Sequence, residues 1–338
     1  MEIKKLHISN FKSIGEKGVT IHAPNPFSVF VGPNASGKSN FFEALEFFNF
    51  ISKSSSNETF RLFGGTENIT HKKYGKKYLG FEANFKSFDS YVNLSTTEIF
   101  EKSTSSGSGR FYSDLKDLYN TDEYYIKFDE YIQFFNNFSR IFIRNKDLEK
   151  IKYEDDQKLS LSCRNLESVL KRILKNENIR EDIIEWLQLL VPGFENIEIQ
   201  SSELSGTDSL LIYEKGFTKP FTKNLLSDGT YNILSILAAV FQSDKPQFLC
   251  IEEPENGLNP KVIKELVNLF RDKTGEGHFI WLNTHSQTLV SQLKEEEIII
   301  VDKIEGETRV KQIEKGKSYG LKLDEAWLTN VLGGGNPW

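Results

Sequence analysis

The chain has 338 residues, a length that suits one large domain or two lobes rather than one small domain. Apolar residues make up 38% of it, and 27 phenylalanines can fill a sizeable core. The formal net charge of −6 excludes a chain coated in basic surface, although a local basic groove is compatible with it.

The sequence shows no pattern typical of export or membrane insertion. Residues 1–5 lack the apolar stretch of a signal peptide, and no window approaches the roughly 18 uninterrupted apolar residues of a membrane helix. Cys163 and Cys250 lack the spacing of a metal site and are expected to be buried, reduced thiols. We therefore expect a soluble, cytoplasmic protein that does not contact a membrane.

The first fifty residues predict strands that lead into a helix. Strands are expected over residues 3–8, 19–22 and 27–31, where apolar side chains alternate or run together. A glycine loop follows the third strand directly, and residues 40–48 continue as a helix without a breaker. The polar stretch over about 51–76 favours a loop. Strand, glycine loop and helix, in that order, are the context that a phosphate-binding P-loop requires.

The glycine loop has the residue types that bind a nucleoside triphosphate. Its sequence is Gly32, Pro33, Asn34, Ala35, Ser36, Gly37, Lys38, Ser39, and Asn40, the next residue, is also predicted to bind the cofactor. The glycines let backbone N–H groups converge on phosphate oxygens at the positive end of a helix. Lys38 is predicted to reach the β- and γ-phosphates of ATP, and the Ser39 hydroxyl is predicted to bind Mg²⁺.

The middle of the chain predicts a second, mainly helical lobe. Strand-like alternation over residues 78–93 gives way to helical spacing over 166–174 and 183–191. Aromatic residues over 128–135 are followed by a Lys/Arg-rich segment over 140–152. Such interleaving can stack on and neutralise nucleic acid, but aromatic residues at helical spacing more often form core.

The last third returns to alternating helices and strands. The predicted elements are a helix over 231–241, a strand over 247–251, a helix over 259–273 and strands over 278–283, 298–301 and 308–313. Asn259 is expected to cap the second helix, with Pro260 at its first position, where the missing N–H costs nothing.

Two adjacent carboxylates, Glu252 and Glu253, follow the predicted strand over 247–251. Burying two acids side by side is costly unless a cation or a proton compensates, whereas two solvated acids before a turn at Pro254 would cost little. Beside a P-loop, a buried acid pair compensated by a cation is favoured, because P-loop ATPases hold Mg²⁺ with an acid on a different buried strand. We assign Glu252 to the metal and Glu253 to orienting or deprotonating the attacking water.

Two further segments flank the acid pair. Ser227, Asp228 and Gly229 precede the apolar helix over 231–241, and by themselves they are an ordinary cap at a helix N-terminus. His285 follows the strand over 278–283. One histidine after a strand is weak evidence of function, and its place after the acid pair strengthens it.

In this order the motifs resemble the ABC-type ATPases, in particular the soluble heads of SMC and RecF proteins. Within that superfamily the chain looks most like the AAA-family ATPases grouped with OLD-type (overcoming-lysogenisation-defect) ATPase heads. The matching stretches are residues 8–14 (ISNFKSI), 31–40 (VGPNASGKSN), 226–230 (LSDGT), 251–260 (IEEPENGLNP) and 284–286 (THS). Together they span almost the whole chain.

The resemblance implies roles that spacing alone cannot give. Ser227 and Gly229 match the signature motif, which in such proteins binds the γ-phosphate of ATP held by a second subunit. Residues 256–257 match the loop that crosses the dimer interface, and His285 matches the switch histidine that senses the γ-phosphate. Lys12 matches a basic residue near the nucleotide. A second copy would thus cover the face of the triphosphate that a P-loop leaves open.

Three features depart from the family pattern. Glu252 stands where an Asp is usual, one methylene longer, which leaves its division of labour with Glu253 open. Asp228 places an acid within the signature, so it must point away from the phosphates or pair with a cation. Gln242 and Gln247 come too late in the order to serve as the metal-sensing glutamine, and that role stays empty.

The expected fold is α/β: a P-loop NTPase of the ABC type, with a mixed sheet flanked by helices and an inserted, mainly helical lobe. Residues 1–95 and 245–338 are expected to form the ATP-binding lobe, and residues 96–244 the helical lobe with the signature. The resemblance implies an ATPase that switches by forming a homodimer, or a higher oligomer, around ATP and Mg²⁺. It also implies work in DNA maintenance or antiviral defence, with a nucleic acid or a separate nuclease-like effector protein.

Three alternatives compete with this hypothesis. An ATP-binding scaffold that assembles a partner nuclease, with incidental turnover, would use the same residues. A nuclease of the OLD type is disfavoured, because only about fifty residues follow His285 and a further acid-lined domain needs more. The motor subunit of a membrane transporter is disfavoured by the segment over 8–14, by the stretch EEPENGL and by the large insertion.

Overall fold

The computed structural model describes residues 2–51, 56–73, 79–87, 90–96, 137–143, 156–201, 207–275, 277–313, 315–316 and 320–334. The chain divides into two compact units. The first comprises Met1–Phe138, Pro246–Cys250 and Thr274–Trp338, and the second comprises Ser139–Lys245 and Ile251–Lys273. The aromatic stretch over 128–135 and most of the basic stretch over 140–152 lie outside the described residues.

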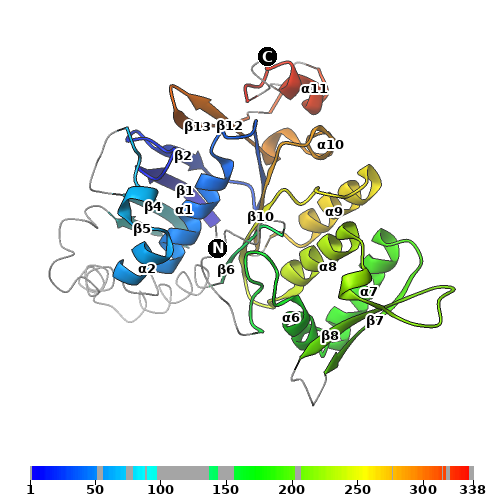
Figure 1. The fold of residues 1–338 in the computed structure, drawn as a ribbon. Coiled ribbons are helices and arrows are strands. Elements are labelled where there is room, and N and C mark those ends of the chain that lie inside the picture. The colour runs from blue at the N-terminus through cyan, green and yellow to red at the C-terminus, as the bar shows by residue number, and fades with distance from the viewer. Residues whose placement is uncertain are drawn as a thin grey trace. The chain divides into compact units, whose positions relative to one another are not determined.

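A six-stranded mixed sheet has the order β13-β12-β3-β11-β10-β6 (Figure 1). β3 (Phe27–Val31) pairs in parallel with β11 (Phe279–Thr284) and with β12 (Ile298–Ile304), and β12 pairs antiparallel with β13 (Glu307–Gln312). β10 (Phe248–Glu252) and β6 (Phe138–Ile141) complete the sheet. Every residue of β3 and β11 is buried, which explains why both segments are mostly apolar in the sequence.

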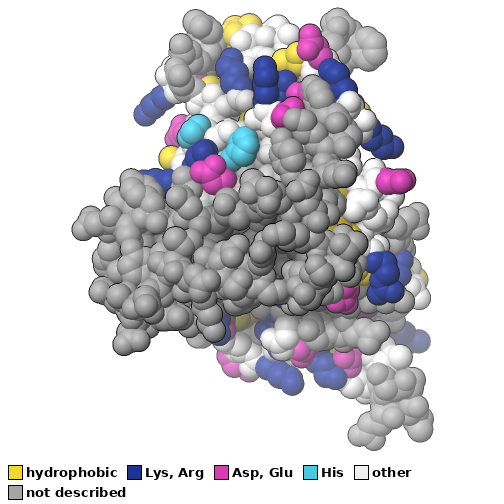
Figure 2. All heavy atoms as spheres, turned by 90° about the vertical axis from the view of Figure 1, so that its left-hand side faces the viewer, with side chains coloured by type: hydrophobic (Ala, Val, Ile, Leu, Met, Phe, Trp, Pro, Cys, Tyr) yellow, Lys and Arg dark blue, Asp and Glu magenta, His cyan; other side chains and the backbone are white. Residues whose placement is uncertain are grey.

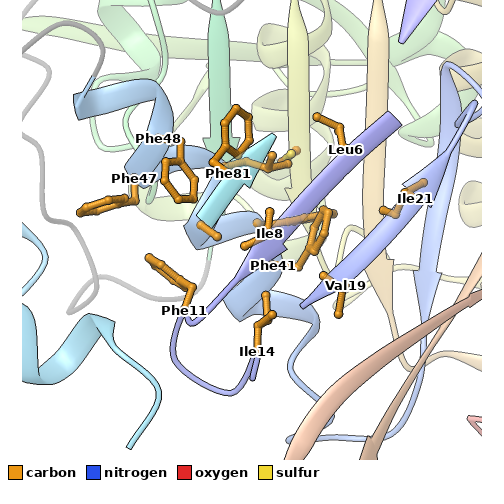
Figure 3. Packing of buried hydrophobic residues seen from close by; sticks show 14 of the residues in the cluster. Leu6, Ile8, Phe11, Ile14, Val19, Ile21, Phe41, Phe47, Phe48 and Phe81 are labelled. Carbon is orange, nitrogen blue, oxygen red and sulfur yellow. The ribbon is translucent and has the colours of Figure 1, made fainter. Parts of the chain in front are cut away.

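A four-stranded antiparallel sheet, β2-β1-β4-β5, also belongs to the first unit. Its strands are β1 (Glu2–Ser9), β2 (Val19–His22), β4 (Gly80–Ser87) and β5 (Ser90–Thr96). The helix after the glycine loop, α1 (Lys38–Ile51), packs on both sheets. Phe41 lies 4.9 Å from Phe30 of β3 between ring centroids, and Phe48 stacks on Phe81 of β4 at 4.5 Å (Figure 3). The phenylalanines thus fix α1, and with it the loop that opens it.

Two short helices follow α1, where a loop over 51–76 was expected, so that prediction was wrong. They are α2 (Ser56–Leu62) and α3 (Thr66–Ile69). Phe60 and Phe63 are buried and lie 5.5 and 5.2 Å from the ring of Phe47 between centroids. Packing of these aromatic side chains therefore overrides the polar local sequence. The first unit also contains α10 (Gln287–Val290), the 3₁₀ turn η3 (Glu295–Glu297) and α11 (Leu323–Leu328).

The second unit contains four described helices and a small sheet (Figure 1). The helices are α6 (Leu166–Ile173), α7 (Glu177–Leu190), α8 (Asp228–Phe241) and α9 (Pro260–Asp272). The antiparallel sheet joins β7 (Phe194–Ser201), β8 (Asp208–Glu214) and β9 (Phe221–Thr222), followed by the 3₁₀ turn η2 (Lys223–Leu225). The inserted lobe was expected to be mainly helical, and its described part also contains these three strands.

Local signals placed several of these elements correctly. Asn259 caps α9 as predicted, since its Oδ1 accepts a hydrogen bond from the N–H of Val262 at 3.0 Å and Pro260 opens the helix. Cys163 and Cys250 are free and buried, as expected. In the parts of the chain that the structure describes, every helix is too short or too polar to span a membrane.

Candidate functional site

The glycine loop lies in the first unit, between β3 and α1. Neighbouring atoms lie so close to its glycines that they leave no room for a side chain. A Cβ on Gly32 would lie 2.1 Å from the carbonyl oxygen of Val301. Gly37 has a φ of 104°, and a Cβ there would lie 1.9 Å from the Thr308 hydroxyl oxygen. Ala35 also adopts a left-handed φ of 63°, a strained position of the kind found at functional sites. The loop therefore has one tight shape set by its surroundings.

Lys38 is buried and folded back over the loop. Its Nζ donates hydrogen bonds to the carbonyl oxygens of Gly32 at 2.7 Å and Pro33 at 2.9 Å. Ser36 is also buried, and its hydroxyl has no hydrogen-bond partner among the described residues. Asn34 and Ser39, by contrast, are exposed. A buried amine and an unpartnered buried hydroxyl on one loop are groups that phosphate oxygens could accept from.

Polar side chains brace the loop, and two of them, Ser13 and Thr308, were not predicted from the sequence. The Thr308 hydroxyl, on β13, donates to the carbonyl oxygen of Ser36 at 2.9 Å and lies 2.7 Å from the Ser13 hydroxyl. Asn40 donates to the same Ser13 hydroxyl at 2.7 Å. Asn40 thus contacts Ser13, one of the residues that hold the loop. Thr308 connects the loop to β13, and it lies 272 residues after Ser36 in the sequence.

Lys12 lies on the turn after β1 and forms an ion pair with Glu43 of α1. Its backbone has a φ of 48°, and its N–H donates to the carbonyl oxygen of Ile69 at 2.6 Å. The structure therefore joins Lys12 to the helix that carries the P-loop. Its predicted contact with the nucleotide stays a prediction.

Glu252, at the end of β10, forms a buried ion pair in the second unit. The Nη2 and Nε atoms of Arg140 lie 2.5 and 2.6 Å from Oε1 of Glu252, and the two side chains are only 3% and 1% exposed. Arg140 lies on β6, 112 residues away in the sequence. From the sequence it was placed only in a general basic stretch, because no local pattern marks a partner at such a separation.

Glu253 has a left-handed backbone, with a φ of 47°. Its Oε2 accepts a hydrogen bond from the Asn256 side chain at 2.8 Å. The carbonyl oxygen of Asn256 in turn accepts from the Asn232 side chain of α8 at 2.6 Å. A Cβ on Gly229 would lie 3.0 Å from the carbonyl oxygen of Gly257, so the start of α8 packs closely on this loop. The structure thus brings the acid, the loop after it and the signature segment together.

The signature segment, Ser227–Gly229, opens α8 at the surface of the second unit. Ser227 caps the helix, accepting from the N–H of Thr230 at 3.1 Å. Ser227 and Asp228 are exposed, whereas α8 is buried from Asn232 to Phe241. Burial raises the pKa of the Tyr231 phenol, which therefore stays protonated and donates to the carbonyl oxygen of Cys163 at 2.9 Å.

His285 follows β11 in the first unit and is exposed. The next residue, Ser286, caps α10 by accepting from the N–H of Leu289 at 3.4 Å, and its own N–H donates to the Thr284 hydroxyl at 2.9 Å. The backbone on both sides of His285 is therefore held while its side chain faces outward. The predicted residues form two groups, since the P-loop, Lys12 and His285 belong to the first unit and the acids and signature segment to the second.

The described residues fit ATP with a divalent cation. The crowded glycines, the unpartnered Ser36 hydroxyl and the Lys38 amine suit phosphate oxygens. The Ser39 hydroxyl and the Glu252 carboxylate are oxygen ligands of the kind that Mg²⁺ prefers. Oε1 of Glu252 is bound by Arg140, and the metal role of this carboxylate stays a prediction.

The fold and the loop define a P-loop ATPase of the ABC and SMC-like class. More narrowly, over residues 27–291 the chain matches the family described as "AAA domain, putative AbiEii toxin, Type IV TA system", and it belongs to that family.

Solved structures show the same fold. An SMC head bound to the C-winged helix domain of ScpA has a TM-score of 0.59 and 16% identity, covering 95% of this chain and 100% of that one. The SMC head domain from Thermotoga maritima has a TM-score of 0.51 and 15% identity, covering 93% and 100%. An Smc head with an extended coiled coil from Pyrococcus furiosus, bound to the C-terminal domain of ScpA, has a TM-score of 0.55 and 16% identity, covering 98% and 99%. The predicted fold class and SMC-like recognition are confirmed, and the OLD-type grouping stays a prediction.

Two curated relatives match short stretches of the chain. An ABC transporter ATP-binding protein from Pyrococcus abyssi is 32% identical over 77 residues, covering 23% of this chain and 29% of its own length. The energy-coupling factor transporter ATP-binding protein EcfA2 from Mycoplasma pneumoniae is 24% identical over 87 residues, covering 26% of each. The chain thus spans less than a third of either relative, and both names describe proteins that bind ATP.

Proposed function

We propose that this chain binds and hydrolyses ATP with Mg²⁺ and acts as an ATP-dependent dimerisation switch. The observation that carries the proposal is the braced P-loop, where a buried lysine amine and an unpartnered serine hydroxyl lie on one tightly constrained turn. The family and the fold support the same function, since both belong to P-loop ATPases.

Each candidate residue then has a physical task. Lys38 exchanges its two carbonyl partners for phosphate oxygens, and the N–H groups of the loop bind the same anion. Mg²⁺, when bound by Ser39 and Glu252, would neutralise charge on the phosphates. Glu253 orients or deprotonates the attacking water, which requires Asn256 to share or release its carboxylate. His285 and Lys12 are proposed to contact the nucleotide.

A second copy of the chain is the proposed partner that completes the site. The signature segment is exposed at the start of a buried helix, and Leu225 just before it is 67% exposed. An exposed apolar side chain beside the exposed start of a helix is suited to an interface that forms around an anion. The signature segment of one copy would then cover the γ-phosphate bound by the P-loop of the other.

For the biological output we propose a role in antiviral defence, in which a separate nuclease-like effector responds to the switch. The family description names a toxin of a toxin–antitoxin system, which favours defence over DNA maintenance. In Figure 2 the visible described side chains of Lys and Arg lie intermixed with those of Asp and Glu.

The decisive experiment is the Glu253→Gln variant. We expect it to bind ATP as the parent does, to hydrolyse ATP about 100-fold more slowly or worse, and to accumulate ATP-dependent dimer. Nucleotide binding, steady-state turnover and light scattering coupled to size exclusion measure the three quantities. Glu265→Gln makes the same change on α9, where the acid accepts an exposed hydrogen bond from Asn268, and it should behave as the parent. Parental turnover by Glu253→Gln would remove this residue from the mechanism.

The scaffold alternative has one observation in its favour, the hydrogen bond that engages Glu253 with Asn256. A chain whose base is held away from water would bind ATP and turn it over slowly. The same variant distinguishes the two functions, because a scaffold needs binding alone. Full biological activity of Glu253→Gln, combined with loss of activity in Lys38→Ala, would establish the scaffold.

A further inference from the structure

Three polar side chains of the first unit, Asn40, Ser13 and Thr308, form a bracing row along the P-loop. Nδ2 of Asn40 donates to the Ser13 hydroxyl at 2.7 Å, and that hydroxyl lies 2.7 Å from the Thr308 hydroxyl. Thr308 then donates to the carbonyl oxygen of Ser36 at 2.9 Å. The backbone N–H of Thr308 also donates to the carbonyl oxygen of Ser13 at 2.8 Å. The bracing row thus connects Ser36, within the loop, with Asn40, just after it.

The chemistry of the atoms determines the direction of each hydrogen bond in the bracing row. The carbonyl oxygen of Ser36 can only accept, so the single proton of the Thr308 hydroxyl points at it. The Ser13 hydroxyl must therefore donate to Thr308, although the distance alone would permit either direction. Nδ2 of Asn40 can only donate. All three hydrogen bonds thus run toward Ser36, and bonds in such a series strengthen one another.

The last of these bonds orients one peptide group of the P-loop. The carbonyl of Ser36 and the N–H of Gly37 belong to the same planar peptide, and in a trans peptide they point in opposite directions. Because Thr308 holds the carbonyl toward β13, the N–H of Gly37 faces away from β13. The Thr308 and Ser36 side chains are both buried, so water has little access to replace this hydrogen bond. The bracing row therefore fixes the direction of a backbone donor.

We propose that Thr308 is a positioning residue for the phosphates of ATP, acting through the peptide between Ser36 and Gly37. The proposal rests on the proposed function, in which N–H groups of the P-loop bind the triphosphate. Thr308 touches neither a phosphate nor the metal in this assignment. It holds the peptide with its N–H toward the phosphate side, and Ser13 orients the Thr308 hydroxyl. Without that hydroxyl the Ser36 carbonyl loses its donor, and the peptide can turn its negative end toward the anion.

A positioning role and a merely structural role predict different results. If Thr308 served stability alone, its loss would lower the free energy of unfolding, and the chain that remains folded would bind ATP as the parent does. If Thr308 orients the peptide, the folded chain itself binds the phosphates more weakly. Inorganic tripolyphosphate, which has no base or ribose, should then lose affinity by the same factor as ATP.

The test measures binding of a fluorescent ATP analogue, and its displacement by tripolyphosphate, in Thr308→Val and Thr308→Ser. Valine keeps the branched shape and removes the hydroxyl, and we expect the affinity for both ligands to fall about tenfold. Serine keeps the hydroxyl and should stay within about twofold of the parent. Thr329→Val is the matched control, because Thr329 donates to the carbonyl oxygen of Glu325 at 2.7 Å in the same unit, and it should bind as the parent does.

A double variant tests the order of the bracing row. Ser13→Ala alone should weaken ATP binding about threefold, and in a Thr308→Val background it should cause no further loss, because Ser13 acts through Thr308. Parental affinity of Thr308→Val would overturn the proposal, as would equal losses in Thr308→Val and Thr308→Ser or additive effects in the double variant. If Thr308→Val fails to fold, Ser13→Ala decides, since parental affinity there would also overturn the proposal. A parent chain that binds no nucleotide at all would instead overturn the proposed function.

Discussion

At the scale of single residues, backbone conformation decides which side chains the P-loop tolerates. Gly37 is the clearest case, because its left-handed φ of 104° and its contact with Thr308 both exclude a side chain. Glu253 is the opposite case, a non-glycine residue with a φ of 47° at a proposed catalytic position. Strain of this kind persists where surrounding contacts fix the backbone, and the hydrogen bond from Asn256 is one of them.

Replacing Gly37 by alanine should damage nucleotide binding far more than backbone strain alone explains. A left-handed alanine costs about 1–2 kcal/mol, and the collision with the Thr308 hydroxyl adds to that cost. We expect ATP affinity to fall more than about tenfold, which corresponds to about 1.4 kcal/mol. Equilibrium binding of a fluorescent ATP analogue measures the change.

Gly306 provides the matched control for this substitution. It lies in the same unit, in the β12–β13 turn, with a φ of 86°, and no described atom lies within 4 Å of the position that a Cβ would take there. Gly306→Ala should therefore carry the strain without the collision and should bind ATP as the parent does. Equal loss of affinity in the two variants would show that the contact with Thr308 is unimportant.

At the scale of elements, the sequence predicted most strands and helices to within a few residues. The strand over 27–31 and the cap at Asn259 follow from a mostly apolar run and from an Asn-Pro pair, which are local signals. α2 was missed because its helix depends on Phe60 packing against Phe47, a contact that no local pattern reveals. The Arg140–Glu252 pair was missed for the same reason. The two residues meet because β6 lies beside β10 in the sheet, and the local sequence does not reveal that strand order.

The contact between α8 and the loop after Glu253 leads to a prediction about coupling. Asn232 is buried and donates to the carbonyl oxygen of Asn256, whose side chain holds Glu253. In Asn232→Ala we expect normal ATP affinity, a loss of about 1–2 kcal/mol in unfolding free energy, and slower hydrolysis, because the loop is no longer tied to the helix. Denaturant unfolding and turnover assays measure these quantities.

Asn268→Ala is the control for this prediction, since its side chain makes a comparable hydrogen bond to Glu265 on the exposed side of α9. It should change neither stability by more than about 0.5 kcal/mol nor turnover. If Asn232→Ala lost stability but hydrolysed ATP at the parental rate, the contact would be structural only.

At the scale of the whole molecule, the order of strand, P-loop, signature, acid pair and histidine was enough to predict the fold class, and SMC heads have the same fold. The sequence places the lobe boundaries at residues 95 and 245, and this division into an ATP-binding lobe and a helical lobe stays a prediction. The compact units are interleaved more finely, with residues 251–273 grouped with the inserted lobe. The linear sequence does not reveal this, because the division between the units falls inside β10, between Cys250 and Ile251.

The proposed dimer makes a prediction that only the assembled molecule can satisfy. Suppose that the signature segment acts on the ATP of a second copy. A Lys38→Ala chain is then inactive alone because its P-loop fails, and a Ser227→Arg chain is inactive alone because its signature segment fails. A mixed dimer contains one P-loop and one signature segment that are both intact and face each other across the two-fold axis. Mixing equal amounts should therefore restore about a quarter of the parental turnover, since about half of the dimers are mixed and each has one working site.

Loss of the helix cap must be separated from loss of the signature contact. Ser227 is exposed, so an arginine there meets solvent in the single chain, but it no longer caps α8. Asn176→Arg removes the cap of α7 in the same way, because Asn176 accepts from the N–H of Asn178 at 3.1 Å, and this variant should retain parental turnover. Restoration in the Lys38→Ala and Ser227→Arg mixture requires action between chains, whereas a mixture that stays inactive while each variant folds and dimerises would place Ser227 outside the catalytic contact.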